Sequence, residues 1–226
     1  MRKLTITIAL LAFSMMVLAQ QSEVRQLSSF NGIKAAEAVD VYLKKGDKES
    51  VRVEVTGTNL DNVITEVAGS YLRIHMREGN YRNRNVKAYV TYVSLDKISA
   101  SSASNVFSDG PIKANQMDVS VSSAATVELQ LDAGDVTADA SSAGDVVLEG
   151  KARSLEAEAS SAGDIDAYRL ECEVVDARAS SAGSIKVNAT KELTARASSG
   201  GDVRYRGNPI KTNTDSSSGG SVKKSN

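Results

Sequence analysis

A six-residue motif recurs at nearly constant spacing through the second half of the sequence, and this repeat limits the folds open to the chain. The copies are SSASNV at 101, SSAATV at 122, SSAGDV at 141, SSAGDI at 160, SSAGSI at 180, SSGGDV at 198 and SSGGSV at 217. Their starts lie 18 to 21 residues apart. A fixed period of this kind is typical of proteins in which one structural unit stacks on the next.

Alignment of the copies on their Ser-Ser pair shows alternating apolar and polar columns. The columns three and one residues before the pair contain mainly alanine. The column between them is polar and includes Asp139, Glu158, Arg178 and Arg196, so Glu158 is expected next to Arg178 on the adjacent repeat. Alternation with a period of two predicts a strand with one inward face. A second strand follows the pair, with an inward column made of Val106, Val127, Val146, Ile165, Ile185, Val203 and Val222. Between the two strands, small residues such as Ala143 and Gly144 suit a tight corner, where glycine can adopt a positive φ.

Each period therefore predicts a strand, a tight corner, a second strand and a variable return. Helical hairpin repeats usually need about 33 residues or more, so helices fit this period poorly. Parallel strands stacked about 4.8 Å apart give a parallel β-helix, or β-solenoid, with about 19 residues per coil. The fold class predicted is all-β, and the alanine columns indicate a narrow, flattened interior.

The N-terminal segment has the pattern of a secretory signal peptide. Arg2 and Lys3 precede an apolar run that ends in small residues, and we expect cleavage after Ala19. This run is too short to be a membrane-spanning helix, and no second long apolar run follows it. Residues 1–19 are therefore predicted to be a signal peptide that directs the chain out of the cytoplasm, to the periplasm, the cell surface or the medium.

Charge and cysteine content exclude several classes of partner and chemistry. Without Arg2 and Lys3 the chain carries 25 basic against 28 acidic residues, a net charge of about −3. This balance argues against a nucleic-acid partner, which usually requires a concentrated basic face. The single cysteine, Cys172, cannot form an internal disulfide and is expected to be a small core residue.

The chain from residue 20 to 226 is expected to form one β-helix domain with two parts. Residues 96–222 hold the regular repeats, and residues 25–95 are β-rich but lack the period. The irregular part is predicted to form longer coils or a small antiparallel cap, since an open terminal coil would expose unpaired backbone groups. Strands are predicted there at 39–43, 51–55, 63–67, 71–76 and 86–93. At the other end, polar residues replace apolar ones in the last repeat, which suits a C-terminal cap.

The opening of this part and the serial repeats together resemble a known family. Phe30-Asn31-Gly32-Ile33, then VDVYL at 39, and LDKI at 95 leading into the S-S-A-G-D coils are similar to the head GIN domain family, described as auto-transporter adhesin heads and common in exported proteins of Bacteroidetes. The resemblance covers residues 25 to 222 or so. It implies a right-handed β-helix and offers no established catalytic residues to carry over.

The polar columns of the repeats do not form a convincing catalytic or metal site. Stacked carboxylates such as Asp145 and Asp164 suit Ca²⁺, but Ser184 interrupts the column and Asp at a corner commonly caps its own backbone. The paired serines are expected to bond to one another along the stack. The only histidine, His75, has no identifiable serine partner. We therefore predict no catalytic, cofactor or metal-binding residues and no bound cofactor.

The function favoured is an exported, non-enzymatic binding or adhesion module that presents a long β-solenoid surface to an extracellular protein or glycan. The alternative is a polysaccharide-active lyase or hydrolase, by analogy with β-helical enzymes, although those have longer coils and large loop insertions. A third possibility is a structural protein that assembles end to end, which the polar last repeat disfavours. The candidate contact patch is made of Tyr81, Arg82, Arg84, Tyr89 and Tyr92.

Overall fold

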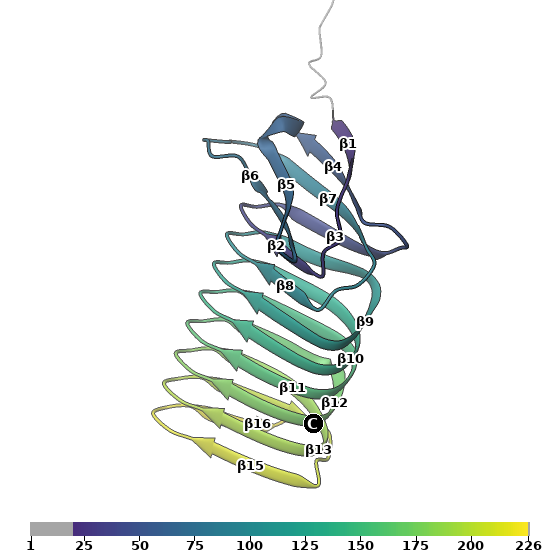
Figure 1. Ribbon diagram of the computed structural model, residues 1–226. Helices are drawn as coiled ribbons and strands as arrows, with labels where there is room; N and C mark the ends of the chain where they lie inside the picture. Colours follow the sequence, from purple (N-terminus) through teal and green to yellow (C-terminus); the bar gives the residue numbers. More distant parts are fainter. Residues whose placement is uncertain (1–19, 226) are drawn as a thin grey trace, which may run out of the picture.

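The computed structural model describes residues 20–225, so the predicted signal peptide lies outside the described residues. The chain forms a flattened β-solenoid of about seven turns with about 19 residues per turn (Figure 1). The all-β solenoid predicted from the repeat is therefore confirmed. No helix within residues 20–225 is long and apolar enough to cross a membrane.

Five long strands, each paired in parallel with the next, make the regular part of the solenoid. They are β9 (Asn105–Val121), β10 (Thr126–Ala140), β11 (Asp145–Ala159), β12 (Asp164–Ala179) and β13 (Ser184–Ala197). The first residues of β9 pair with β3 (Asp40–Lys45), whereas its last residues pair with β8 (Lys97–Ala100). Each long strand thus runs along two walls of the solenoid. We call the wall of the strand starts wall A and the wall of the strand ends wall B.

The variable return predicted between repeats is not a separate segment, because one continuous strand runs through it. Neighbouring coils bend at the same place, so the backbone ladder continues around the bend. Differences in coil length are absorbed as bulges. The longest repeat, for example, inserts residues 108–110 opposite Leu129.

The tight corner is a type I′ β-turn whose two central residues have positive φ. Ser142 and Ala143 have φ values of 50° and 58°, and the Gly144 N–H donates to the Ser141 carbonyl over 2.9 Å. In the SSAG copies the positive φ therefore belongs to Ser and Ala, which corrects the role assigned to glycine. Left-handed backbone costs an L-residue roughly 1–2 kcal/mol. In this turn the left-handed conformation directs the Ala143 N–H to the Ser161 carbonyl of the next turn, 3.2 Å away.

The glycine that ends each SSAG turn is required for space. A Cβ at Gly163 would overlap the carbonyl group of Ala140, which belongs to the backbone of the preceding coil. In the SSGG copies the first glycine, such as Gly200, occupies the second left-handed position, with φ of 75°. A Cβ added to Gly200 would meet no other atom within 4 Å. The two glycines thus meet different requirements.

The N-terminal part adds two coils whose stacking order differs from their order in the chain. One coil consists of β2 (Gly32–Ala35) and β3, and the other of β6 (Tyr71–Met76) and β7 (Asn85–Tyr92). β2 pairs with both β6 and β8, and β3 pairs with both β7 and β9. The coil that comes first in the sequence therefore lies between the later coil and the regular repeats.

Antiparallel strands close this end of the solenoid, as predicted. β4 (Ser50–Thr56) pairs with β7 and with β1 (Gln21–Gln26) on wall A, and β5 (Val63–Ala68) pairs with β6 on wall B. A short 3-10 turn, η1 (Leu60–Asn62), joins the two walls. The five strands predicted in residues 25–95 are confirmed within two residues at each end, whereas β1 and β2 were not predicted.

A continuous hydrophobic core extends from Phe30 to Val203. The inward column after the Ser-Ser pair is buried as predicted as far as Val203, whereas Val222 is half-buried. Ile165 and Cys172 are 0% exposed. The last coil is completed by β14 (Asp202–Arg206), β15 (Lys211–Ser216) and β16 (Ser221–Lys224). Thr212 and Thr214 of β15 occupy the columns of Leu193 and Ala195 and are exposed, so the predicted polar end is confirmed.

Candidate functional site

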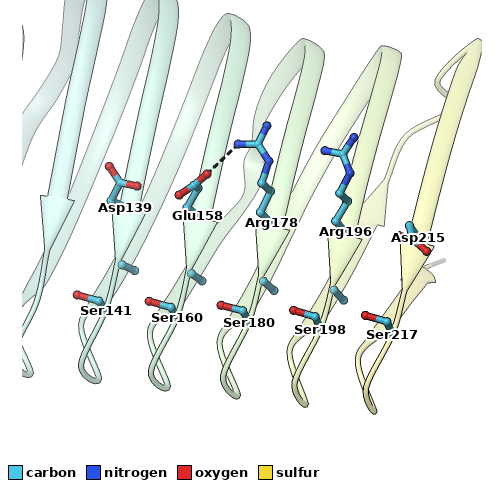
Figure 2. A pocket seen from close by; sticks show the side chains of 14 residues that line it. Asp139, Ser141, Glu158, Ser160, Arg178, Ser180, Arg196, Ser198, Asp215 and Ser217 are labelled. Carbon is cyan, nitrogen blue, oxygen red and sulfur yellow. Dashed lines mark hydrogen bonds and ion pairs between the residues drawn. The ribbon is translucent and has the colours of Figure 1, made fainter.

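A groove of about 560 Å³ crosses five coils on wall B (Figure 2). Its first row of side chains occupies the outward position two residues before each Ser-Ser pair. In the first four coils, buried alanines on both sides of this position hold it on the outward face, because the strand alternates between core and solvent. The strand register aligns the row in the order Asp139, Glu158, Arg178, Arg196 and Asp215.

The second row of the groove consists of the first serine of each turn. These residues are Ser141, Ser160, Ser180, Ser198 and Ser217. Their backbones continue the ladder; for example, the Ser160 N–H donates to the Ala140 carbonyl over 3.0 Å. The hydroxyls point the same way along the groove (Figure 2). Parallel strands about 4.8 Å apart hold them too far apart to bond to one another, so the predicted hydroxyl ladder is replaced by a backbone ladder.

Arg178 is the electrostatic centre of the groove. Its guanidinium contacts the carboxylates of Glu156, Glu158 and Asp176, each at 2.7 Å. Hydrogen bonds to Glu156 and Glu158 raise the pKa of Arg178, which holds it charged. The predicted pairing of Glu158 with Arg178 on adjacent coils is confirmed. Arg196, by contrast, has a distant contact of 3.8 Å with Asp176, so its guanidinium is more available to a ligand.

The end of the groove at Asp139 is acidic. Burial raises the pKa of Asp139, and the nearby carboxylates of Glu158, Asp118 and Glu156 raise it further. Charge along the row therefore changes from acidic at Asp139 to basic at Arg178 and Arg196, and becomes acidic again at Asp215. Such a surface can complement a partner with both charged and hydroxyl groups.

The five residues of the predicted contact patch do not form one surface. Tyr92 is buried, at 3% exposure, because it continues the inward alternation of β7. Tyr89 faces outward from wall A, whereas Tyr81, Arg82 and Arg84 lie in the loop between β6 and β7. The Arg84 guanidinium donates to the carbonyls of Glu37 and Tyr81, at 2.7 and 3.3 Å.

The remaining polar columns have local partners. On wall A, Lys186 contacts Asp164 at 3.8 Å and Arg204 contacts Asp202 at 2.8 Å. Burial, followed by the charge of Asp164, raises the pKa of Asp145. Within residues 20–225, no group of three or more His, Cys, Asp or Glu side chains is arranged to hold a metal ion.

The single histidine and the single cysteine have local roles. The Nδ1 atom of His75 lies 2.9 Å from the carbonyl oxygen of Met76. Burial raises the pKa of the Cys172 thiol to about 12, and Glu171 contributes to the shift. A thiol with so high a pKa is a poor nucleophile at neutral pH.

An outward stack of aromatic rings on wall A was missed in the sequence. It contains Tyr89, Tyr42 and Phe107 on three neighbouring strands. The signal was present, because Val41-Tyr42 and Val106-Phe107 occupy equivalent places in their coils. The coil at 32–45 lacks the Ser-Ser pair that marks the repeats, so an alignment on that pair does not place Tyr42 beside Phe107.

Comparison with known proteins identifies related sequences and structures. The family model described as "Putative auto-transporter adhesin, head GIN domain" matches residues 29–209. A solved structure of a putative adhesin from Bacteroides fragilis has a TM-score of 0.84 at 20% identity, covering 92% of this chain and 97% of that one. No curated protein matches the chain.

Two further solved structures share the fold. A putative adhesin from Parabacteroides merdae has a TM-score of 0.70 at 16% identity, covering 92% of this chain and 96% of that one. A putative lipid binding protein from Parabacteroides distasonis has a TM-score of 0.66 at 18% identity, covering 92% of this chain and 97% of that one. At these identities the likeness establishes the solenoid fold.

Proposed function

Since the chain belongs to the head GIN domain family, we propose that it is an exported, non-enzymatic adhesion module that binds an extracellular protein or glycan. The observation that carries this proposal is the groove on wall B. Five consecutive coils each present one charged side chain and one serine hydroxyl there, in fixed register. A stiff solenoid of this kind offers an extended surface along which an elongated partner can make one contact per coil.

The groove favours recognition over catalysis because its polar groups are spread along the solenoid axis. The groove serines repeat once per coil, about 4.8 Å apart, and no histidine is among the described residues that line the groove beside them, whereas a nucleophile and its base must lie within hydrogen-bonding reach. An adhesin of this family acts outside the cytoplasm, in the periplasm, at the cell surface or in the medium. The predicted signal peptide at 1–19 is consistent with that location.

Binding of residues 20–226 to arrays of glycans and extracellular proteins tests this function. We expect retention of at least one array component without cleavage. An Arg196→Ala variant should weaken retention about tenfold if the groove is the contact surface, because a charged hydrogen bond is lost. A Lys113→Ala variant serves as a matched control, since Lys113 is an exposed cation that does not line the groove. Absence of any retained component would contradict the proposal.

A polysaccharide-active enzyme is the second candidate, and the acidic end of the groove supports it. Asp139 and Glu158 lie on adjacent coils, and the raised pKa of Asp139 suits a general acid. Retaining glycosidases place two carboxyl groups about 5 Å apart. Chromatography of polysaccharides incubated with the protein would reveal cleavage products. Products that disappear in both Asp139→Asn and Glu158→Gln variants would favour the enzyme over the adhesion module.

A further inference from the structure

The aromatic stack on wall A brings two of the chain's seven tyrosines and one of its three phenylalanines together at one surface. The ring centroids of Tyr89 and Tyr42 lie 5.1 Å apart, and those of Tyr42 and Phe107 lie 5.4 Å apart. The rings are nearly parallel, with interplanar angles of 18° and 25°. All three project outward and are half-buried. The stack therefore runs along the solenoid axis as a surface ridge.

The two ends of the stack are different. At one end, the Arg52 guanidinium covers the outer face of Tyr89, 4.1 Å from the ring centroid. At the other end, Phe107 is followed in its column by Glu128, an exposed residue on the next coil. The outer face of the Phe107 ring is thus next to a carboxylate instead of another ring.

A hollow of about 330 Å³ adjoins Tyr42 and Phe107 at this end of the stack. Its lining includes Glu128, Gln130 and Val147 from the next two coils. Its volume falls within the range of about 300–1,000 Å³ typical of small-ligand sites. The hollow therefore combines an aromatic surface with exposed carboxylate and amide groups.

A bulge shapes and fixes the edge of this hollow. Residues 108–110 are the insertion opposite Leu129, directly after Phe107. The Gln130 backbone N–H donates to the Ser108 hydroxyl oxygen over 2.8 Å, which ties the bulge to the next coil. Bulges are common next to binding sites, where they redirect side chains. Here the bulge leaves room beside the Phe107 ring. Because the hydrogen bond to Ser108 already fixes the bulge, a ligand loses less binding free energy to the ordering of this segment.

We infer that this hollow is a binding site for a neutral pyranose unit of a glycan; the inference rests on the adhesion function proposed above and names its ligand class. An aromatic face carries a negative potential, which attracts the weakly positive C–H groups on one face of a pyranose ring. The sugar hydroxyls can donate to the Glu128 carboxylate and exchange hydrogen bonds with the Gln130 amide.

The charges of the hollow favour neutral sugars over acidic ones. Glu149, which also lines it, is paired with Arg169 at 2.6 Å. The Glu128 side chain brings a negative charge to the aromatic surface. A uronate carboxylate placed there would be repelled, since like charges in proximity are unfavourable. The site should thus discriminate between two chemical classes of glycan.

Isothermal titration calorimetry of residues 20–226 tests the inference with defined probes. The probes are hexasaccharides of β-1,4-linked glucose, mannose, xylose and N-acetylglucosamine, together with hexagalacturonate. We expect at least one neutral hexasaccharide to bind, and hexagalacturonate to bind at least tenfold more weakly. Phe107→Leu keeps an apolar side chain but removes the ring face, and it should weaken binding about tenfold.

Tyr168→Ala is the matched control, because Tyr168 is another outward tyrosine, covered by Arg206 at 4.1 Å from its ring centroid. It should leave saccharide affinity unchanged. Melting temperatures of both variants separate lost binding from lost folding. Equal weakening by Phe107→Leu and Tyr168→Ala, or tighter binding of hexagalacturonate, would overturn the inference.

A separate result distinguishes this inference from the adhesion function itself. If Phe107→Leu leaves saccharide binding intact while Arg196→Ala abolishes it, the glycan occupies wall B and the wall A inference fails, although the adhesion function stands. If the unmodified protein binds array proteins but none of the neutral saccharides, the inference likewise fails alone. If it binds nothing in either assay, both proposals fail.

Discussion

The regular coils and the N-terminal coils share two walls and one core, but they close their turns by different means. From residue 101 onward, each turn is held by backbone hydrogen bonds to the turn of the neighbouring coil. The coil of β6 and β7 has a longer loop at residues 77–84 instead. There, the Arg84 side chain bonds to the Glu37 carbonyl, and the Glu37 carboxylate accepts from the Met76 N–H at 2.8 Å.

This difference shows how a solenoid end can be made without a repeating turn. The turn at Glu37 and Ala38 has positive φ at both residues, as in the regular coils, and the Ala38 N–H donates to the Ser102 carbonyl over 2.9 Å. The other side of the turn at Glu37 and Ala38 faces the loop between β6 and β7, which does not form an equivalent turn. Side chains there satisfy polar groups that would otherwise be unpaired, as buried backbone groups require.

The largest expected effect comes from placing a charge in the core of either region. Ile165 and Leu72 are both 0% exposed, one in each region. Ile165→Asp and Leu72→Asp should each lower the free energy of unfolding by about 4 kcal/mol or more, because an unpaired carboxylate is buried. Urea titration followed by circular dichroism measures the loss.

The same experiment tests whether the two regions unfold as one domain. We expect a single transition that moves in both variants. A Leu72→Asp protein that shows a second transition at the unmodified midpoint would contradict this. Val147→Asp, at a half-buried outward position, is the control and should cost less than about 1 kcal/mol.

The regular turn can be examined with two glycine substitutions. Gly163→Ala should destabilise the protein by about 1–3 kcal/mol, because the new Cβ meets backbone atoms of the preceding coil. Gly200→Ala should change stability by less than about 1 kcal/mol, since alanine occupies the equivalent left-handed position at Ala182. Thermal unfolding monitored by circular dichroism compares them. Equal losses would contradict the conclusion that intercoil space requires glycine at position 163.

The N-terminal closure can be tested through Arg84. Arg84→Ala should lower the free energy of unfolding by about 1–2 kcal/mol, because hydrogen bonds from a charged donor to two carbonyls are lost. Arg82→Ala, two residues away and exposed, should change it by less than about 0.5 kcal/mol. Denaturant titration provides both values. If the two variants lose the same free energy of unfolding, Arg84 behaves as an ordinary surface residue and its hydrogen bonds do not stabilise the N-terminal end of the solenoid.

Sequence alone predicted the inward columns and the charged row of wall B because both depend on alternation within a strand. Register then followed from the constant period, which placed Glu158 beside Arg178. The positive φ of Ser142 and Ala143 could not be predicted from residue type, since both are ordinary L-residues. It depends on hydrogen bonds to the next coil, and those exist only once the coils have stacked.

The N-terminal coils show a second limit. Nothing in the local pattern of β2 indicates that a later segment, β6, will separate it from the cap. That order depends on pairing between strands far apart in the sequence. The burial of Tyr92 was predictable, however, because Val86, Ala88 and Val90 alternate inward with it in β7. The clustering of tyrosines in this segment suggested a contact patch that included Tyr92. The alternation of β7, however, places the Tyr92 side chain in the core.

The smallest expected effect concerns Asp139 at the acidic end of the groove. Its pKa is raised above the ordinary 3.8 by burial and by neighbouring carboxylates, so folding favours the protonated form. Loss of the proton therefore costs stability as pH rises from 3.8 through the raised pKa. Asp139→Asn should stabilise the protein at pH 7, by less than about 1 kcal/mol for a surface charge.

This gain should disappear as the pH falls below the ordinary carboxyl value, where Asp139 is protonated in both the folded and unfolded states. Denaturant titrations at pH 7 and pH 3 measure the difference. Ser120→Asn, in the same outward column on the preceding coil, adds an amide without removing a charge, and its effect should not vary between the two pH values. A gain from Asp139→Asn that persists at pH 3 would mean that packing or hydrogen bonding, and not the local excess of negative charge, limits the stability of this end of wall B.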